Sequence, residues 1–130
     1  MKVLIAIPLL SVSVATSAGD SLAARVDHAK AVENSPVGQL YQRELWKALG
    51  QDTANLMLEC FPKGVQSDAS SFTFVANVLA SGALGEVRVE PGTPMTTCFS
   101  TGFSALEFPR PPASFRKTGL PLVIQMEITE

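Results

Sequence analysis

The stretch that decides the fold begins with FTFVANVLASGALGEVRVE at residues 72–90 and closes with PLVIQMEI at residues 121–128. Apolar residues recur at every second position in both segments, which is the period of a β-strand. The segment ASGALG between the first two strands carries two glycines, which can adopt positive φ, and we expect it to form a hairpin loop. The strands of this hairpin are predicted at Phe72–Leu79 and Gly85–Glu90.

The three strands differ in how they distribute apolar residues over their two faces. The first strand carries them on both faces, which is typical of a central strand. In the second strand, Val87 and Val89 are expected to point inward, and Glu86, Arg88 and Glu90 outward. The last strand, residues 121–128, alternates regularly.

A helix is expected between the hairpin and the last strand, because Thr93 suits an N-cap and Pro94 the first helical position. We expect its buried side to be formed by Cys98, Phe99, Phe103 and Leu106. Together these elements predict an α+β fold in which helices cover a small antiparallel three-stranded sheet, made from a hairpin, a helix and a returning strand.

Upstream, Ser35-Pro36 is a second helix start signal. Apolar residues then recur at helical spacing at Val37, Leu40, Tyr41, Leu45, Ala48 and Leu49. We expect Gly50 to end this helix, and Asp52 or Thr53 to cap a second one that runs to Cys60. Residues 19–34 are polar and Ala-rich, and we expect a polar N-terminal arm that is either a short helix or loosely ordered.

Residues 1–18 have the pattern of a secretory signal peptide: Lys2, a mostly apolar run, and small residues at 16–18. The alternative is an uncleaved anchor, but serines and a threonine interrupt the run, which is shorter than the ~20 residues of a spanning helix. After cleavage we expect no stable membrane insertion. The remaining residues 35–130 are predicted to form a single α+β domain with its preceding helices.

The charge of the chain argues against two classes of partner. The net charge is −2, and no cluster of Lys and Arg stands out in the sequence. Nucleic acid and anionic membrane surfaces both require such clusters. We therefore expect neither as a partner.

The predicted export affects how the two cysteines, Cys60 and Cys98, are interpreted. In an oxidising compartment an even number of cysteines favours a disulfide. The alternatives are a metal site or a catalytic thiol, but two distant cysteines and the single, distant His28 do not make a zinc ligand set. We predict a structural disulfide, and expect neither a metal nor a cofactor.

These elements, in this order, resemble the C-terminal domain of TonB-type energy transducers. The resemblance is greatest to the disulfide-bearing AgmX/PglI-type TonB-like variant. It covers about residues 52–129 and depends on short motifs: LECF at 58–61, GEVRV at 85–89, Thr93-Pro94, Cys98, and LEFPRPP at 106–112.

The resemblance implies that the hairpin's first strand lies in the middle of the sheet and that the C-terminal strand lies on an edge. TonB-like domains use that edge to take a strand from a partner. The matching residues here are Leu122, Val123, Ile124, Gln125, Met126, Glu127 and Ile128. The chain lacks a convincing anchor and a long Pro-rich linker, so a free-standing adaptor fits better than an energy transducer.

Catalytic motifs receive little support. Ser114-Phe-Arg-Lys117 and Lys117-Thr-Gly119 match two motifs of penicillin-interacting serine enzymes, but they share Lys117, which cannot fill both roles. We expect His28 to be solvent-exposed and the scattered carboxylates to be surface residues. Arg110, Arg116 and Lys117 are also interpreted as ordinary surface charge.

The sequence thus favours a non-enzymatic, exported interaction module of a Gram-negative cell envelope, periplasmic or secreted. It would bind a protein partner by strand addition, or in the groove between the edge strand and the helix with Leu40, Tyr41 and Trp46. A homodimer through the edge strand is compatible with this prediction. The alternatives are a small exported hydrolase, an enzyme inhibitor or a purely structural envelope protein.

Overall fold

The computed structural model describes residues 20–129, so the predicted signal peptide at 1–18 lies outside the described residues. The elements are α1 (Leu22–Glu33), α2 (Pro36–Cys60), β1 (Ser71–Val78), β2 (Leu84–Glu90), α3 (Pro94–Ser104), the 3-10 turn η1 (Ala113–Phe115) and β3 (Leu120–Glu127). The strands form one antiparallel sheet in the order β2-β1-β3. The predicted α+β fold is confirmed, with β1 in the centre, β3 on an edge and the strand ends within one residue of prediction.

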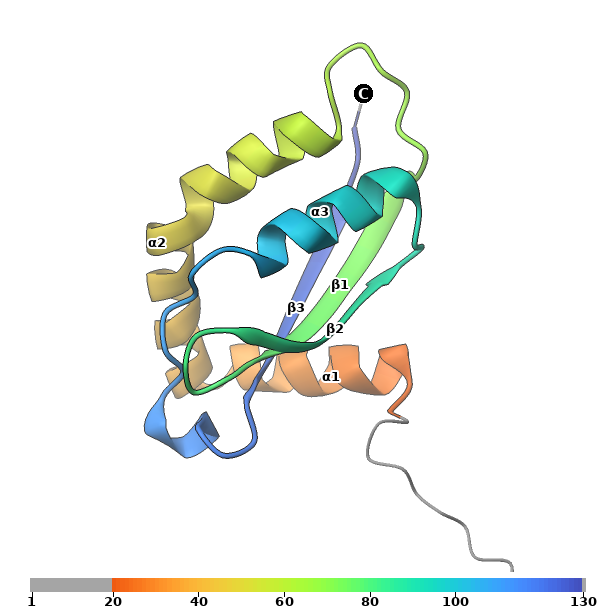
Figure 1. The fold of residues 1–130 in the computed structure, drawn as a ribbon. Helices are drawn as coiled ribbons and strands as arrows, with labels where there is room; N and C mark the ends of the chain where they lie inside the picture. Colours follow the sequence, from red (N-terminus) through yellow and green to blue (C-terminus); the bar gives the residue numbers. More distant parts are fainter. Residues whose placement is uncertain (1–19, 130) are drawn as a thin grey trace, which may run out of the picture.

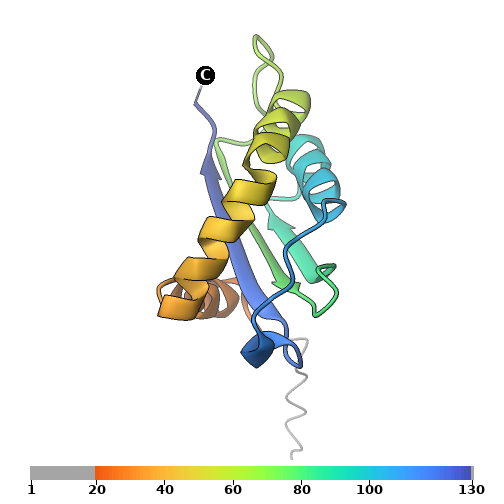
Figure 2. The same ribbon diagram turned by 90° about the vertical axis from the view of Figure 1, so that its left-hand side faces the viewer.

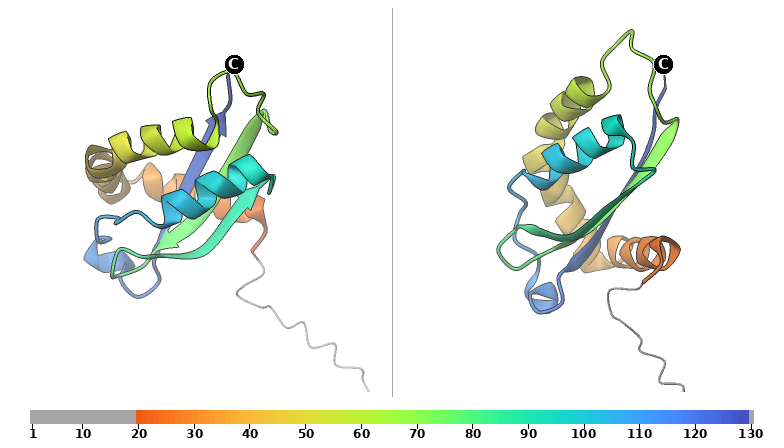
Figure 3. Two further views of the ribbon diagram at one scale, coloured as in Figure 1. Left: turned by 45° about the horizontal axis from the view of Figure 1, so that its top comes forward. Right: turned by 45° about the vertical axis from the view of Figure 1, so that its right-hand side comes forward.

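The sheet lies between two helical layers (Figure 1), with α2 and α3 on one face and α1 on the other (Figure 3). The main core fills the α2/α3 side, where Phe72, Phe74, Ala76 and Val78 of β1 are all nearly inaccessible. Aromatic rings organise it: the Phe74 ring meets the ring of Phe103 edge-on at 5.2 Å between centroids. Such edge-to-face pairs add to the stabilisation from burial alone.

The opposite face of the sheet is covered in part by α1. Leu22, Val26 and Ala29 recur at helical spacing and pack against Val75 and Val123 in a small second core. Of the two predicted alternatives for residues 19–34, the helix is therefore the one found for residues 22–33. This helix is weakly amphipathic because its apolar stripe is only three side chains long.

Helix α2 corrects the prediction of a break at Gly50, because it runs without interruption from Pro36 to Cys60. It changes direction midway (Figure 1). Near the bend, the Thr53 hydroxyl donates a hydrogen bond to the Leu49 carbonyl, with 2.7 Å between the oxygens. Such back-bonding bends helices, so Thr53 stands in the bend and does not cap a new helix.

The helix starts predicted at Ser35 and Thr93 are both confirmed. The Ser35 hydroxyl accepts a hydrogen bond from the Gly38 N–H at 3.1 Å and donates one to the Val32 carbonyl at 2.6 Å, so one side chain joins the end of α1 to the start of α2. At α3, Thr93 and Thr96 form a reciprocal capping box. Phe99 and Phe103 are fully buried as expected, whereas Cys98 is exposed.

Candidate functional site

Cys60 and Cys98 form a disulfide, which confirms the predicted pair. Cys60 ends α2 and is 4 % exposed, while Cys98 lies in the second turn of α3. The bond therefore ties the two helices of the main layer together and closes a separation of 38 residues.

The strand β3 pairs with β1 on one side only, and its other side is an edge of the sheet. The Ile128 N–H donates to the Ser70 carbonyl at 2.8 Å, which fixes the phase of the ladder. In an antiparallel pair, residues that exchange backbone hydrogen bonds alternate with residues that do not. With the observed register, Pro121, Val123, Gln125 and Glu127 therefore direct their backbone groups away from β1.

This phase agrees with the chemistry of Pro121, which has no N–H to donate and is tolerated where the ladder does not need one. Beyond it, the edge is regular. Val123 is buried beneath α1, but Gln125 and Glu127 are exposed because α1 stops short of them. Figure 2 shows α2 crossing the line of β3 and the C-terminal half of the strand lying clear of both helices.

The other edge, β2, is irregular. The register shifts between Val75 and Asn77, and Glu86 has a φ of 50°, which marks a β-bulge. Val87 is left 40 % exposed. The prediction that Val87 points inward is therefore wrong, because the extra residue interrupts the alternation on which it was based.

The three aromatic and apolar residues expected beside the edge do not share one surface of α2. Tyr41 is buried, and its hydroxyl donates to the Pro109 carbonyl at 2.9 Å. Burial, with the nearby Glu44 carboxylate, raises the pKa of the Tyr41 phenol. Leu40 and Trp46 are exposed, but they lie about 120° apart around the helix at 100° per residue.

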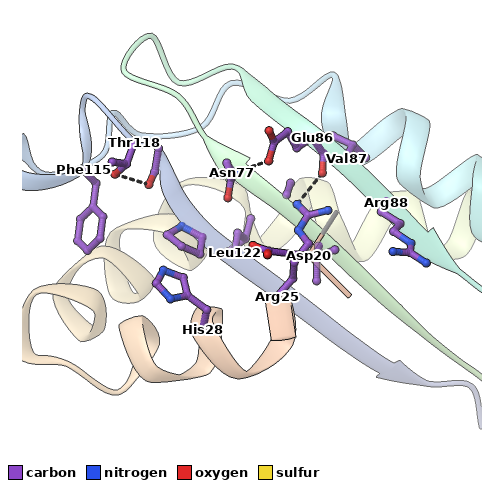
Figure 4. A pocket seen from close by; sticks show the side chains of 14 residues that line it. Asp20, Arg25, His28, Asn77, Glu86, Val87, Arg88, Phe115, Thr118 and Leu122 are labelled. Carbon is purple, nitrogen blue, oxygen red and sulfur yellow. Dashed lines mark hydrogen bonds between the residues drawn. The ribbon is translucent and has the colours of Figure 1, made fainter. Parts of the chain in front are cut away.

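A hollow of about 420 Å³ lies between α1 and the sheet (Figure 4). Three parts of the chain line it: the start and middle of α1, the bulged region of β1 and β2, and the segment from η1 into β3. Its charged and polar residues are Asp20, Arg25, His28, Asn77, Glu86, Arg88 and Thr118. No signal in the sequence pointed to this hollow, because its residues are scattered from Asp20 to Leu122.

Two hydrogen bonds hold the bulge at the wall of this hollow. An Arg25 guanidinium nitrogen donates to the Glu86 carbonyl at 2.6 Å, and the Asn77 amide donates to the Glu86 carboxylate at 2.9 Å. Arg88 forms an ion pair with the exposed Glu90. That is the only ion pair found between side chains of residues 20–129, so Arg25 has no carboxylate partner there.

The remaining residues considered from the sequence do not gather into one site. His28 is exposed, as expected, and borders the hollow. Ser114, Arg116 and Lys117 are exposed around η1, whereas Arg110 borders a second hollow near the hairpin loop and the end of α3.

Residues 20–129 contain no group of three or more His, Cys, Asp or Glu side chains that could hold a metal ion. None of the helices described for them is long and apolar enough to cross a membrane.

Comparison with protein-family models, curated proteins and solved structures found no match. The resemblance to TonB-like domains therefore stays a prediction from the sequence.

Proposed function

We propose that this protein is an exported, non-enzymatic interaction module of the cell envelope that takes a strand of a protein partner onto the free edge of β3. The observation that carries the proposal is the regular, unpaired run of backbone groups at Val123, Gln125 and Glu127. An extended partner can pair with such groups, and its side chains then supply specificity. The TonB-like resemblance points to the same strand.

The difference between the two edges of the sheet supports the choice of β3. Bulges and charged side chains protect edge strands from strand addition. β2 has both, in the bulge at Glu86 and the pair Arg88–Glu90, whereas β3 pairs without a bulge along its whole length. A strand partner therefore meets a bulge at β2 and none at β3.

Helix α2 carries an exposed aromatic residue that a partner could contact. Tyr41 faces the Pro109 loop, and Trp46 lies about 140° further round the helix, away from that loop. In Figure 2 the C-terminal half of β3 lies on the opposite side of α2 from the loop that follows α3. We propose that a partner bound at the edge also contacts the exposed Trp46 ring, and we expect the partner side chains that face it to be apolar.

The disulfide and the signal-peptide pattern of residues 1–18 support the proposed location. Disulfides persist in the periplasm and outside the cell and are rare in the cytosol. The Cys60–Cys98 bond is compatible with export, and the signal-like segment at 1–18 would direct it.

Site-specific photo-crosslinking in the native envelope tests the proposal. The photoreactive residue p-benzoylphenylalanine replaces Glu127 on the edge, or Gln51 on the exposed side of α2 as a control. We expect an adduct with one protein from position 127 and none from position 51. An adduct of equal yield from both positions, or from position 51 alone, would contradict a site on β3.

A second comparison uses Gln125→Pro and Gln125→Ala in the chain that carries the crosslinker at 127. The Gln125 N–H points away from β1, so proline removes a donor to the partner without breaking the native ladder. We expect Gln125→Pro to abolish the adduct and Gln125→Ala to retain it, with each variant within about 1 kcal/mol of the parent in stability. An adduct that survives Gln125→Pro excludes strand addition, and unfolding by this variant shows that the edge assignment is wrong.

A further inference from the structure

The hollow between α1 and the sheet has two chemically different ends (Figure 4). Phe115 and His28 lie at one end, with Pro121 and Leu122 among the lining residues. Arg25, Arg88 and Glu86 lie at the other end. A volume of about 420 Å³ falls in the range of small-molecule sites, which combine apolar walls with a few polar groups.

The bulge places Arg88 of β2 on the face of the sheet that lines this hollow. Gly85 lies opposite Asn77, so regular pairing would place Val87 opposite Val75. The inserted residue places Arg88 there instead, on the face that α1 covers. The bulge thus adds a guanidinium to the wall of the hollow beside Val87, and bulges elsewhere re-aim side chains at functional sites in this way.

The bulge is held in place by residues of the hollow itself. Glu86 adopts a left-handed conformation, which is unfavourable for a residue with a Cβ. Arg25 donates to its carbonyl and Asn77 to its carboxylate. Non-glycine residues held in such conformations by their surroundings are concentrated at functional sites.

Among anions, the charges around the hollow favour a singly charged one over a dianion, because two carboxylates line it beside the two arginines and Arg88 is paired with Glu90. Arg25 and Arg88 both line it, and Arg25 has no carboxylate partner among residues 20–129. A carboxylate can accept two parallel N–H bonds from a guanidinium. The carboxylates of Asp20 and Glu86 also line the hollow, and they would repel a dianion such as a phosphate monoester more strongly than a monocarboxylate.

We propose that this hollow binds a small monocarboxylate with an apolar body. The carboxylate lies between Arg25 and Arg88, where it replaces Glu90 as the partner of the Arg88 guanidinium, and the apolar body lies against Phe115 and Pro121. The site is on the α1 face of the sheet and is independent of the proposed strand addition at β3. It is also outside what the TonB-like resemblance implies, because α1 precedes the matching residues 52–129.

The test is a titration of the disulfide-bonded, isotope-labelled protein, followed by amide NMR shifts. The probes are N-acetyl-phenylalanine, N-acetyl-leucine and N-acetyl-alanine, each with its neutral carboxamide as a matched control. We expect saturable shifts at Asn77, Arg88 and Gly119, with affinity that rises with the size of the apolar side chain. The carboxamides should bind at least about tenfold more weakly, since they lack the charge that strengthens the hydrogen bonds.

Variants then assign the binding to the hollow. Arg88→Gln should weaken N-acetyl-phenylalanine binding about tenfold while the spectrum of the folded protein is retained, because Arg88 is itself an exposed side chain. Arg43→Gln, on the exposed side of α2, is the control and should leave the affinity unchanged. The proposal is overturned by equal binding of acid and carboxamide, by equal loss in Arg88→Gln and Arg43→Gln, or by no saturable shift from any acid up to about 20 mM.

Discussion

Removing the disulfide is the perturbation whose cost can be calculated most directly. The bond joins positions 38 apart, so it restricts a long loop of the unfolded chain. On the loop-entropy estimate, closing such a loop stabilises the folded state by about 4 kcal/mol at 25 °C. Small domains have unfolding free energies of about 5–15 kcal/mol, so this single bond is a large share of the total.

The double variant Cys60→Ala/Cys98→Ala measures this contribution by urea denaturation. With a denaturant slope of about 1.5 kcal/mol per M, a loss of about 4 kcal/mol lowers the midpoint by roughly 2–3 M. Cys60 is buried and Cys98 is exposed, so the part of the loss that comes from packing is confined to position 60. The single variant Cys98→Ala removes the bond but keeps the buried Cys60 side chain, whose free thiol is verified by alkylation. Comparing it with the double variant separates the contribution of the bond from that of packing at position 60.

A loss below about 1 kcal/mol in the double variant would refute the reasoning. It would show that the unfolded chain is already compact near these positions, or that α2 and α3 hold together without the bond. If the double variant does not simply show a lower urea midpoint, we expect it to be a chain that no longer folds at about 37 °C.

Three further predictions concern single positions. Gly38→Ala should destabilise the protein by about 3 kcal/mol, because a Cβ would lie 1.7 Å from the Val32 carbonyl oxygen. A Cβ at Gly50 would have no atom within 4 Å, so Gly50→Ala should stabilise α2 by up to about 1 kcal/mol. Equal urea midpoints for the two variants would refute this. Tyr41→Phe should cost about 1 kcal/mol at pH 8 through the lost bond to Pro109. Because the phenol's pKa is raised in the folded state, the stability of the parent should fall as the pH rises above about 10, and Tyr41→Phe should lack this dependence in denaturation at several pH values. Ser104→Ala should raise the melting temperature slightly, since the Ser104 hydroxyl is buried without a hydrogen-bond partner among residues 20–129; a fall in melting temperature would reveal an unseen partner.

The strands and the helix starts were predictable because their signals are local. Alternation in residues 121–128 requires no tertiary information, and Ser35 and Thr93 each stand directly before a proline. The prediction that the helix ends at Gly50 was wrong, because a glycine can be tolerated inside a helix when tertiary contacts stabilise both sides. The buried residues Leu45, Leu49 and Thr53 provide such contacts here. The bulge at Glu86 was not predictable, because GEVRV alternates as an unbulged strand would.

Of the two candidate sites, the edge of β3 was predictable from the sequence and the hollow was not. The position of β3 at an edge was implied by the TonB-like resemblance, and the structure places it there. The hollow depends on where α1 docks, and the three apolar residues of α1 gave too weak a stripe to predict that contact. Arg25 and Arg88 are 63 positions apart in the sequence, and only the packing of α1 and the bulge in β2 bring both to the same hollow.

The most direct test of an open edge at β3 is residue-resolved amide hydrogen exchange of the monomeric, disulfide-bonded protein. Our account predicts alternation: the N–H groups of Ile124 and Met126 are protected by β1, while those of Gln125 and Glu127 exchange fast. Equal, strong protection at Gln125 and Ile124 would contradict the account, because it would mean that the edge is already covered and has no free backbone groups for a partner strand.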